Sequence, residues 1–324
     1  MGDIFNEKPM KRIFDSVYKA INNAIDGLLA GLQGVSEPIT EGTPVNAVAA
    51  TKTLTIAGVV IDGETMTIGD DVYEFCADAA QSLTAGSTIA VDIEAASTKS
   101  AGTLTMDTQP TSGDTMTIGT TVYTFVPIGT ANGEGEIDIG VDLAAAKLAT
   151  VAAINGTDGI NTAHPLVTAA AFAVNDCVIT ALVGGVAGDL IDSTETFTAG
   201  SNVFDAGTLG TTVAGVDCVQ ADAVTALVAA VTASDTQGVG AADGAGDTVI
   251  LTADIKGVSG NAIAIAENMA NGSFAGGAVA LSGGINGTVG DKGDMLFDAN
   301  YFYIAANDNT ITDANWRRIQ SNSY

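Results

Sequence analysis

Apolar residues recur at alternating steps of four and three from residue 14 to residue 35. This spacing places one apolar stripe on a helix and is typical of a coiled coil. The stripe contains Phe14, Tyr18, Ile21, Ile25, Leu28, Leu32 and Val35. Residues 1–36 are therefore predicted to form a helical anchor. The helix either joins a short parallel bundle, for which we favour a trimer, or lies as an amphipathic helix on its own domain. Residues 37–49, which carry Pro38 and Pro44 and have no periodicity, are predicted to be an extended linker.

A thirteen-residue phrase occurs twice. GETMTIGDDVYEF, at residues 63–75, returns 50 residues later as GDTMTIGTTVYTF, at residues 113–125, with nine of thirteen positions identical. In both copies TMTI and VYxF alternate apolar and polar residues, which predicts two strands joined by a turn at 69–71 or 119–121. A further strand is predicted before each copy, at TLTIAG and TLTMDT. Each copy is expected to be a three-stranded antiparallel meander.

Two later segments are also related to each other. Residues 176–191, DCVITALVGGVAGDLI, resemble residues 247–263, DTVILTADIKGVSGNAI. An alanine-rich stretch precedes each of them and predicts a helix, at residues 142–155 and 221–234.

The order of these related segments predicts a nested arrangement. The segment at 176–191 follows the second hairpin copy and is expected to complete it, whereas the segment at 247–263, which comes last, is expected to complete the first copy. A small domain of residues 98–215 would be inserted into a related domain made of residues 50–97 plus 216–287. In the alternative, the halves pair in chain order and exchange partners. The predicted fold class is α+β and β-rich, with two related small domains of this kind.

The end of the chain, residues 288–324, changes character and predicts a small C-terminal β module. Strands are expected at DMLFD, YFYIAA and NWRRI. The aromatic residues Tyr301, Tyr303 and Trp316 gather here. They are expected to pack a compact meander or a subunit interface, and the alternative is a surface platform for a ligand.

The charge is strongly negative, with 38 acidic and 11 basic residues and a formal charge of −27. Such a surface repels phosphates, so direct nucleic-acid binding is not expected. Nor is membrane insertion expected, because no apolar run approaches the ~20 residues that span a bilayer. Basic residues cluster near the start, and Lys8, Lys11 and Arg12 are candidates for docking on a larger partner.

Catalytic patterns are not found. His164, the only histidine, precedes a proline and is interpreted as an ordinary loop residue. The acidic loop at 307–315 lacks the glycine and distal glutamate of a calcium loop. The glycine pairs at 184–189 and 257–261 lack a lysine and a following helix, so they predict tight turns rather than phosphate loops. We expect no enzyme, metal site or cofactor. We interpret the three cysteines as small buried apolar residues of a protein in a reducing compartment. They are Cys76, Cys177 and Cys218.

The ending GDKGDMLFDANYFYIAANDNTITDANWRRI resembles the endings of structural and fibre-like proteins of tailed bacteriophages. The repeated unit is similar to domains of phage head-decoration, head-fibre and tail-associated proteins. In order along the chain, this unit consists of the phrase GDTMTIGTTVYTF, a helix, a GxxGN turn and the sequence LSGG. The second copy departs from this pattern, with GDL in place of GNA and LGT in place of LSGG. The resemblance implies a virion protein that is assembled in the host cytoplasm and binds capsid, neck or tail proteins.

Two functions are compared. The preferred one is a homotrimeric head fibre or capsid decoration protein, anchored by its N-terminus, because the chain is short and lacks the long β-helical repeat of an extended fibre shaft. The alternative is a tail-associated adhesin that contacts the host surface through Tyr301, Tyr303 and Trp316.

Overall fold

The computed structural model describes most of the chain from residue 40 onward. The described residues are 16, 19, 20, 23, 40–41, 43–78, 80–234, 237–277, 279–298, 301–312 and 316–320. The seam residues Phe14, Tyr18, Ile21, Ile25, Leu28 and Leu32 and the docking candidates Lys8, Lys11 and Arg12 lie outside these described residues. The chain divides into two compact units, residues 1–48 with 285–324, and residues 49–284. The predicted β-rich α+β class is confirmed for the described part, which has several small sheets and two helices with defined bounds.

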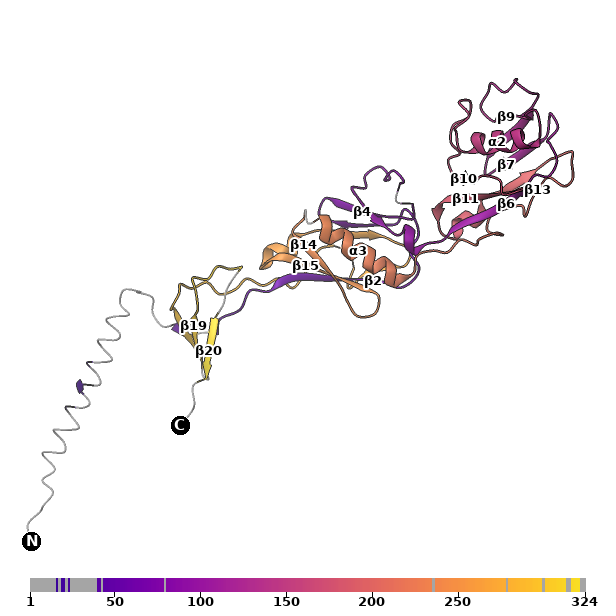
Figure 1. The fold of residues 1–324 in the computed structure, drawn as a ribbon. Helices are drawn as coiled ribbons and strands as arrows, with labels where there is room; N and C mark the ends of the chain where they lie inside the picture. Colours follow the sequence, from indigo (N-terminus) through magenta and orange to yellow (C-terminus); the bar gives the residue numbers. More distant parts are fainter. Residues whose placement is uncertain are drawn as a thin grey trace, which may run out of the picture. The chain divides into compact units, whose positions relative to one another are not determined.

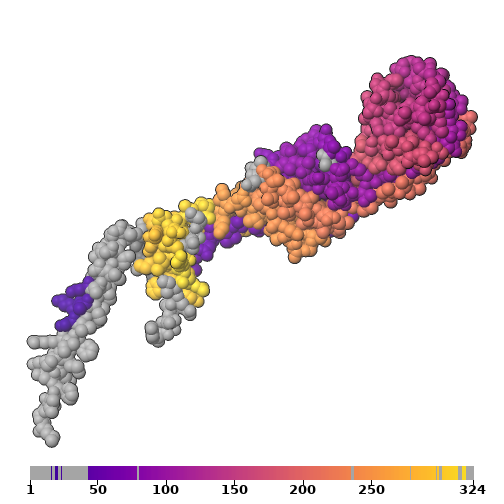
Figure 2. Space-filling view, viewed as in Figure 1, coloured from indigo at the N-terminus to yellow at the C-terminus, as the bar shows by residue number. Residues whose placement is uncertain are grey.

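Two four-stranded sheets are formed by the flanking segments, which we define as residues 49–97 and 216–284. The first sheet has the strand order β14 (Val239–Asp243), β15 (Thr248–Lys256), β2 (Ala49–Ile56) and β17 (Gly272–Phe274). The second has the order β16 (Ile265–Asn268), β3 (Thr65–Ile68), β4 (Asp71–Cys76) and β5 (Ile89–Asp92). Indigo and orange parts of the chain, far apart in sequence, accordingly pack together in the space-filling view (Figure 2).

The middle segment, residues 98–215, forms two sheets with the same organisation. The first has the order β10 (Val167–Ala169), β11 (Asp176–Gly184), β6 (Lys99–Thr105) and β13 (Val203–Phe204). The second has the order β12 (Ser193–Glu195), β7 (Thr115–Ile118), β8 (Thr121–Val126) and β9 (Glu136–Asp138). All strands of these two sheets come from the middle segment.

The repeated phrase forms the predicted hairpins, β3–β4 (the first hairpin) and β7–β8 (the second hairpin). Alternation sets the buried face: Met66 and Ile68 are fully buried, whereas the threonines between them are half-buried. The two-residue turns contain Gly69 and Gly119, with φ of +58° and +56°, a left-handed conformation that glycine adopts without steric cost.

The predicted three-stranded meander is wrong. β2 pairs with β15 and β17, and β6 pairs with β11 and β13, so neither joins the hairpin that follows it. Eight residues separate β2 from β3, too many for a tight hairpin loop. They contain a turn at residues 61–64 that redirects the chain into the second sheet.

Both predicted helices are confirmed, as α2 (Leu143–Ile154) and α3 (Gln220–Ser234). Asp142 caps α2 by accepting a hydrogen bond from the Ala145 amide at 2.9 Å. α3 lies along the sheet that contains β2, β14 and β15 (Figure 1). Small and branched residues one turn apart on α3 complete the first core, which also receives Tyr73 and Phe75 from the first hairpin. The second core contains the equivalent Tyr123 and Phe125 with Ala153 and Ile154 of α2.

The chain enters and leaves the middle segment through two paired residues. The Thr98 amide donates to the Val216 carbonyl at 2.8 Å, and the Val216 amide donates back at 3.1 Å. Val48 and Ile285 exchange the same pair of bonds, at 2.9 and 3.0 Å, where the chain passes residue 48. At both places, the outgoing and returning chain segments run antiparallel and are joined by a pair of backbone hydrogen bonds.

The remaining unit contains one sheet with the strand order β1, β18, β19 and β20. Its strands are β1 (Thr40–Glu41), β18 (Met295–Phe297), β19 (Tyr301–Ala305) and β20 (Trp316–Gln320). The three predicted C-terminal strands are thus confirmed. The predicted linker contributes β1, which runs parallel to β18.

Candidate functional site

Clustered metal ligands do not occur within the described residues, where no three His, Cys, Asp or Glu side chains are placed to hold an ion. In the acidic loop that begins at residue 307, Asp308 accepts a hydrogen bond from the Lys292 amide at 2.8 Å. Neither described helix has the length and hydrophobicity needed to cross a bilayer.

His164 lies in a loop, as expected, but its side chain is buried with only 3% of its surface exposed. Nδ1 accepts a hydrogen bond from the Leu166 amide, and Nε2 faces the Ile118 carbonyl, both at 3.1 Å. The neutral ring with its proton on Nε2 satisfies both partners. Burial lowers the pKa of His164, opposed by the bond to Ile118. The ring therefore ties a loop to the second hairpin.

Buried carboxylates are also used structurally. Glu64 accepts hydrogen bonds from the Ile61 amide (3.1 Å) and the Ala270 amide (2.6 Å). Asp114, its equivalent in the second hairpin, accepts bonds from the Thr111 amide and from Thr198. Both side chains hydrogen-bond the turn before a hairpin to a loop that is distant in sequence, between β16 and β17 or between β12 and β13.

All three cysteines are buried and unpaired with one another. Burial raises the pKa of Cys177 to about 12. Burial together with the charge of Asp222 raises the pKa of Cys218 to about 11, and burial with nearby carboxylates also raises the pKa of Cys76. Because the thiolate is the reactive form, these environments disfavour nucleophilic chemistry.

The glycine pairs form tight turns, as predicted. Gly185 and Gly257, with φ of 113° and 111°, open the five-residue 3₁₀ turns η2 (Val186–Leu190) and η3 (Val258–Ala262). Leu190 is exposed where the related turn has Ala262, and it lines a shallow recess of about 430 Å³.

The aromatic residues of the C-terminal module form a small core. Trp316 and Tyr303 are buried; the Trp316 indole donates to the Thr288 carbonyl at 2.9 Å, and the Tyr303 hydroxyl donates to Asp298 at 2.7 Å. Tyr301 is half-buried, and the Arg318 guanidinium lies over its ring at 4.3 Å. The alternative of a surface platform is therefore wrong for Tyr303 and Trp316, whose polar atoms and rings are already used inside the module.

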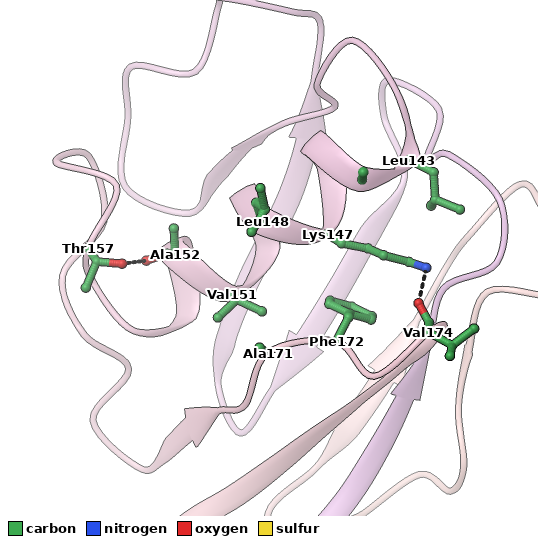
Figure 3. A pocket seen from close by; sticks show the side chains of 10 residues that line it. Leu143, Lys147, Leu148, Val151, Ala152, Thr157, Ala171, Phe172 and Val174 are labelled. Atoms are coloured by element: carbon green, nitrogen blue, oxygen red, sulfur yellow. Dashed lines mark hydrogen bonds between the residues drawn. The ribbon is translucent and has the colours of Figure 1, made fainter.

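An apolar groove lies beside α2, and we call it the α2 groove (Figure 3). Its volume is about 740 Å³, within the range of ligand pockets. Its lining residues are Leu143, Ala144, Lys147, Leu148, Val151, Ala152, Thr157, Ala171, Phe172 and Val174. Leu148 and Val174, which both line the groove, expose 73% and 89% of their surfaces.

One cation and one strained residue define the rim of the α2 groove. Lys147 donates hydrogen bonds from Nζ to the Val174 carbonyl (2.7 Å) and to Asn175 Oδ1 (2.9 Å), and its amine lies 5.4 Å from the Phe172 ring centroid. Val174 has φ of +59°, which is rare for a β-branched residue. The groove can bind an apolar molecule and offer it the third N–H of Lys147.

No protein-family model matches the chain, and comparisons with curated proteins and with solved structures find no similar protein. Sequence reasoning missed the α2 groove because α2 is alanine-rich and carries no strong apolar stripe. The exposed Val174, two residues after Phe172, is the one local signal, since valine is rare in a tight turn.

Proposed function

We propose that this protein is a structural component of a bacteriophage virion, a head fibre or capsid decoration protein. It is anchored by its N-terminus and presents acidic domains to solvent. The observation that supports this proposal is that the chain contains the same β-rich unit twice. In both units, buried polar side chains such as Glu64, Asp114 and His164 form hydrogen bonds within the unit. A display protein needs stable, soluble modules and no reaction centre.

We infer that residues 98–215 are a domain inserted into a related domain of residues 50–97 plus 216–287. The pairing of β6 with β11 and β13, and of β2 with β15 and β17, supports this inference. An exchange of halves would instead place β2 beside β11. The paired crossing at Thr98 and Val216 fits insertion into a surface loop, which folded domains tolerate well.

The proposed anchor is the N-terminal segment, in which Lys8, Lys11 and Arg12 dock on capsid or neck protein. Seven of the eleven Lys and Arg residues belong to residues 1–48 and 285–324. The flanking and middle segments carry most of the acidic residues. This distribution favours docking at the first unit, because the other domains repel acidic surfaces. We propose a homotrimer held by the heptad seam.

Immunogold electron microscopy tests the proposal on phage particles whose genome encodes this chain. An antibody raised against residues 49–284 should label the particle heads. Label on the tails alone would favour a tail-associated protein. Particles without label, from a lysate in which the same antibody detects the chain, would contradict a virion role.

The α2 groove supports a second candidate function, attachment to the host surface. The apolar rim formed by Leu148 and Val174 is solvent-exposed, unlike the C-terminal aromatic cluster. The expected ligand has an apolar body and an acceptor for Lys147. Leu148→Glu should abolish particle adsorption if this candidate is right, whereas Leu190→Glu, in the recess of η2, serves as a matched control.

A further inference from the structure

The C-terminal module contains a third copy of the repeated hairpin. In the second hairpin, the Gly113 amide donates to the Phe125 carbonyl (2.8 Å), and the Phe125 amide donates to the Asp114 carbonyl (2.9 Å). In β18–β19 (the third hairpin), the Gly293 amide donates to the Ala305 carbonyl (3.0 Å), and the Ala305 amide donates back to Asp294 (2.9 Å).

The turn before the hairpin is also the same. The Asp294 amide donates to the Asp291 carbonyl at 2.9 Å, and the Asp291 amide donates to Asp294 Oδ2 at 2.8 Å. Asp114 makes both bonds with Thr111, at 2.9 and 2.8 Å. Gly63, Gly113 and Gly293 all have positive φ, of 81°, 97° and 96°. The three hairpins therefore share one backbone design.

One face of this shared design changes chemistry in the third copy. The core-facing positions stay apolar, with Tyr303 equivalent to Tyr73 and Tyr123. On the other face, the first hairpin has Thr65, Thr67, Val72 and Glu74, and the second has Thr115, Thr117, Val122 and Thr124. The same register positions of the third hairpin are Met295, Phe297, Phe302 and Ile304.

Three of these side chains leave apolar surface at the outside of the module. Phe302 exposes 47% of its surface, and Met295 and Ile304 are half-exposed. An apolar row in place of three threonines and a valine of the second hairpin is typical of an interaction surface. We call this row the outer face of the third hairpin.

We propose that the outer face of the third hairpin is a self-association surface that binds a second copy of this chain. The distribution of charge along the chain favours a second copy as the partner of this face. Residues 1–48 and 285–324 contain eleven acidic and seven basic residues, whereas the remaining residues contain 27 acidic and four basic residues. Copies of so acidic a chain repel each other least at this unit.

The order of segments in the sequence adds a second argument. β1 begins at Thr40 and pairs with β18 at the edge of this sheet, and the predicted apolar seam of residues 14–35 directly precedes β1 in the sequence. A seam that joins several chains would bring their C-terminal modules together. The proposal shares self-association with the proposed function, but it requires no virion role.

Sedimentation equilibrium of the full chain over a range of concentrations tests the surface. Phe302→Thr with Ile304→Thr gives position 304 the threonine of the second hairpin and replaces the exposed aromatic ring at position 302 by a small polar residue. We expect the double variant to raise the dissociation constant of the oligomer at least about tenfold. Val122→Thr is the matched control, because Val122 occupies the register position of Phe302 and is 52% exposed. Its oligomer should be unchanged, and thermal unfolding should show that both variants fold.

Three outcomes are decisive. An oligomer that is weakened by the double variant alone supports the surface. An equally strong oligomer in a folded double variant overturns it and leaves the seam of the proposed trimer intact. A wild-type chain that is monomeric at all concentrations overturns both; if the double variant then makes residues 14–35 more sensitive to protease, the chain's own N-terminal segment is the occupant.

Discussion

Asp114 accepts two hydrogen bonds from Thr198, one from its backbone amide at 2.9 Å and one from its hydroxyl at 2.7 Å, although 84 positions separate the residues. The other carboxylate oxygen accepts from the Thr111 amide at 2.8 Å. In the first hairpin, Glu64 binds the Ala270 amide 206 positions away in the same manner. These carboxylates fix the turn before each hairpin to a loop much later in the chain, which connects β12 to β13 or β16 to β17.

We expect Asp114→Asn to lower the free energy of unfolding by about 1–3 kcal/mol. Both carboxylate oxygens face N–H or O–H donors, and an amide offers only one acceptor, so one donor would meet an NH₂ group. Chemical denaturation measures the effect. Asp192→Asn, an exposed aspartate of the same segment, is the control for loss of one charge. Equal stability of the two variants would show that the hydrogen bonds of Asp114 to Thr111 and Thr198 do not stabilise the fold.

The turn residue Val174 should be a source of strain. Ala173 and Asp176 exchange backbone hydrogen bonds at 2.8 and 3.1 Å, so Val174 occupies a two-residue hairpin turn with φ of +59°. Val174→Gly should stabilise the fold by roughly 0.5–1 kcal/mol, because the relieved strain of about 1–2 kcal/mol exceeds the entropic cost of glycine. Val141→Gly, at an exposed valine, should destabilise. If thermal unfolding shows the same loss for both variants, Val174 is not strained.

Acid should weaken the fold through His164. The ring is buried and neutral, and burial lowers its folded-state pKa below the ordinary value of 6.5. Its contribution to stability is fully present above pH 6.5. As the pH falls from there through the lowered folded-state pKa, only the unfolded chain binds the proton, and the contribution is lost.

Denaturation at a series of pH values measures this effect cleanly, because His164 is the only histidine of the chain. His164→Gln should flatten the pH dependence just below 6.5. Proton NMR of the imidazole gives the folded-state pKa directly. A value at or above 6.5 would show that the buried neutral ring is the wrong description.

The heptad seam should control oligomer size. Ile21→Asp places a charge in the seam and should dissociate the oligomer, as measured by light scattering of the full chain. Asn23→Asp adds the same charge at a helical, exposed position two residues away and should have little effect. If Ile21→Asp leaves the oligomer intact, the helix lies on its own domain instead.

Repetition explains which parts of the fold could be predicted. The first two hairpins share nine of thirteen residues, and their strands, the strand before each hairpin and the helices α2 and α3 were recognisable from alternation or composition. The strands of the third hairpin were predicted, but its likeness to the other two was not, because only three of its thirteen residues match the second: Gly293, Asp294 and Tyr303. Its likeness lies in backbone hydrogen bonds, which sequence patterns do not display.

Long-range pairing explains what was missed. The strand before each hairpin looked like a meander strand, but its partners lie about 80 to 200 residues later, and only the fold brings them together. The same holds for His164, whose loop position gave no sign that Ile118 and Leu166 would bury it. The burial of Trp316 likewise depends on Thr288 and Gly290, which no local pattern connects to it.

Quantitative mass spectrometry of gradient-purified particles tests the central claim most directly. If the chain is a trimeric display protein of a virion, peptides from residues 49–284 should occur at a fixed number of copies per particle, divisible by three. Particles that lack these peptides, from lysates in which the chain is abundant, would contradict the account.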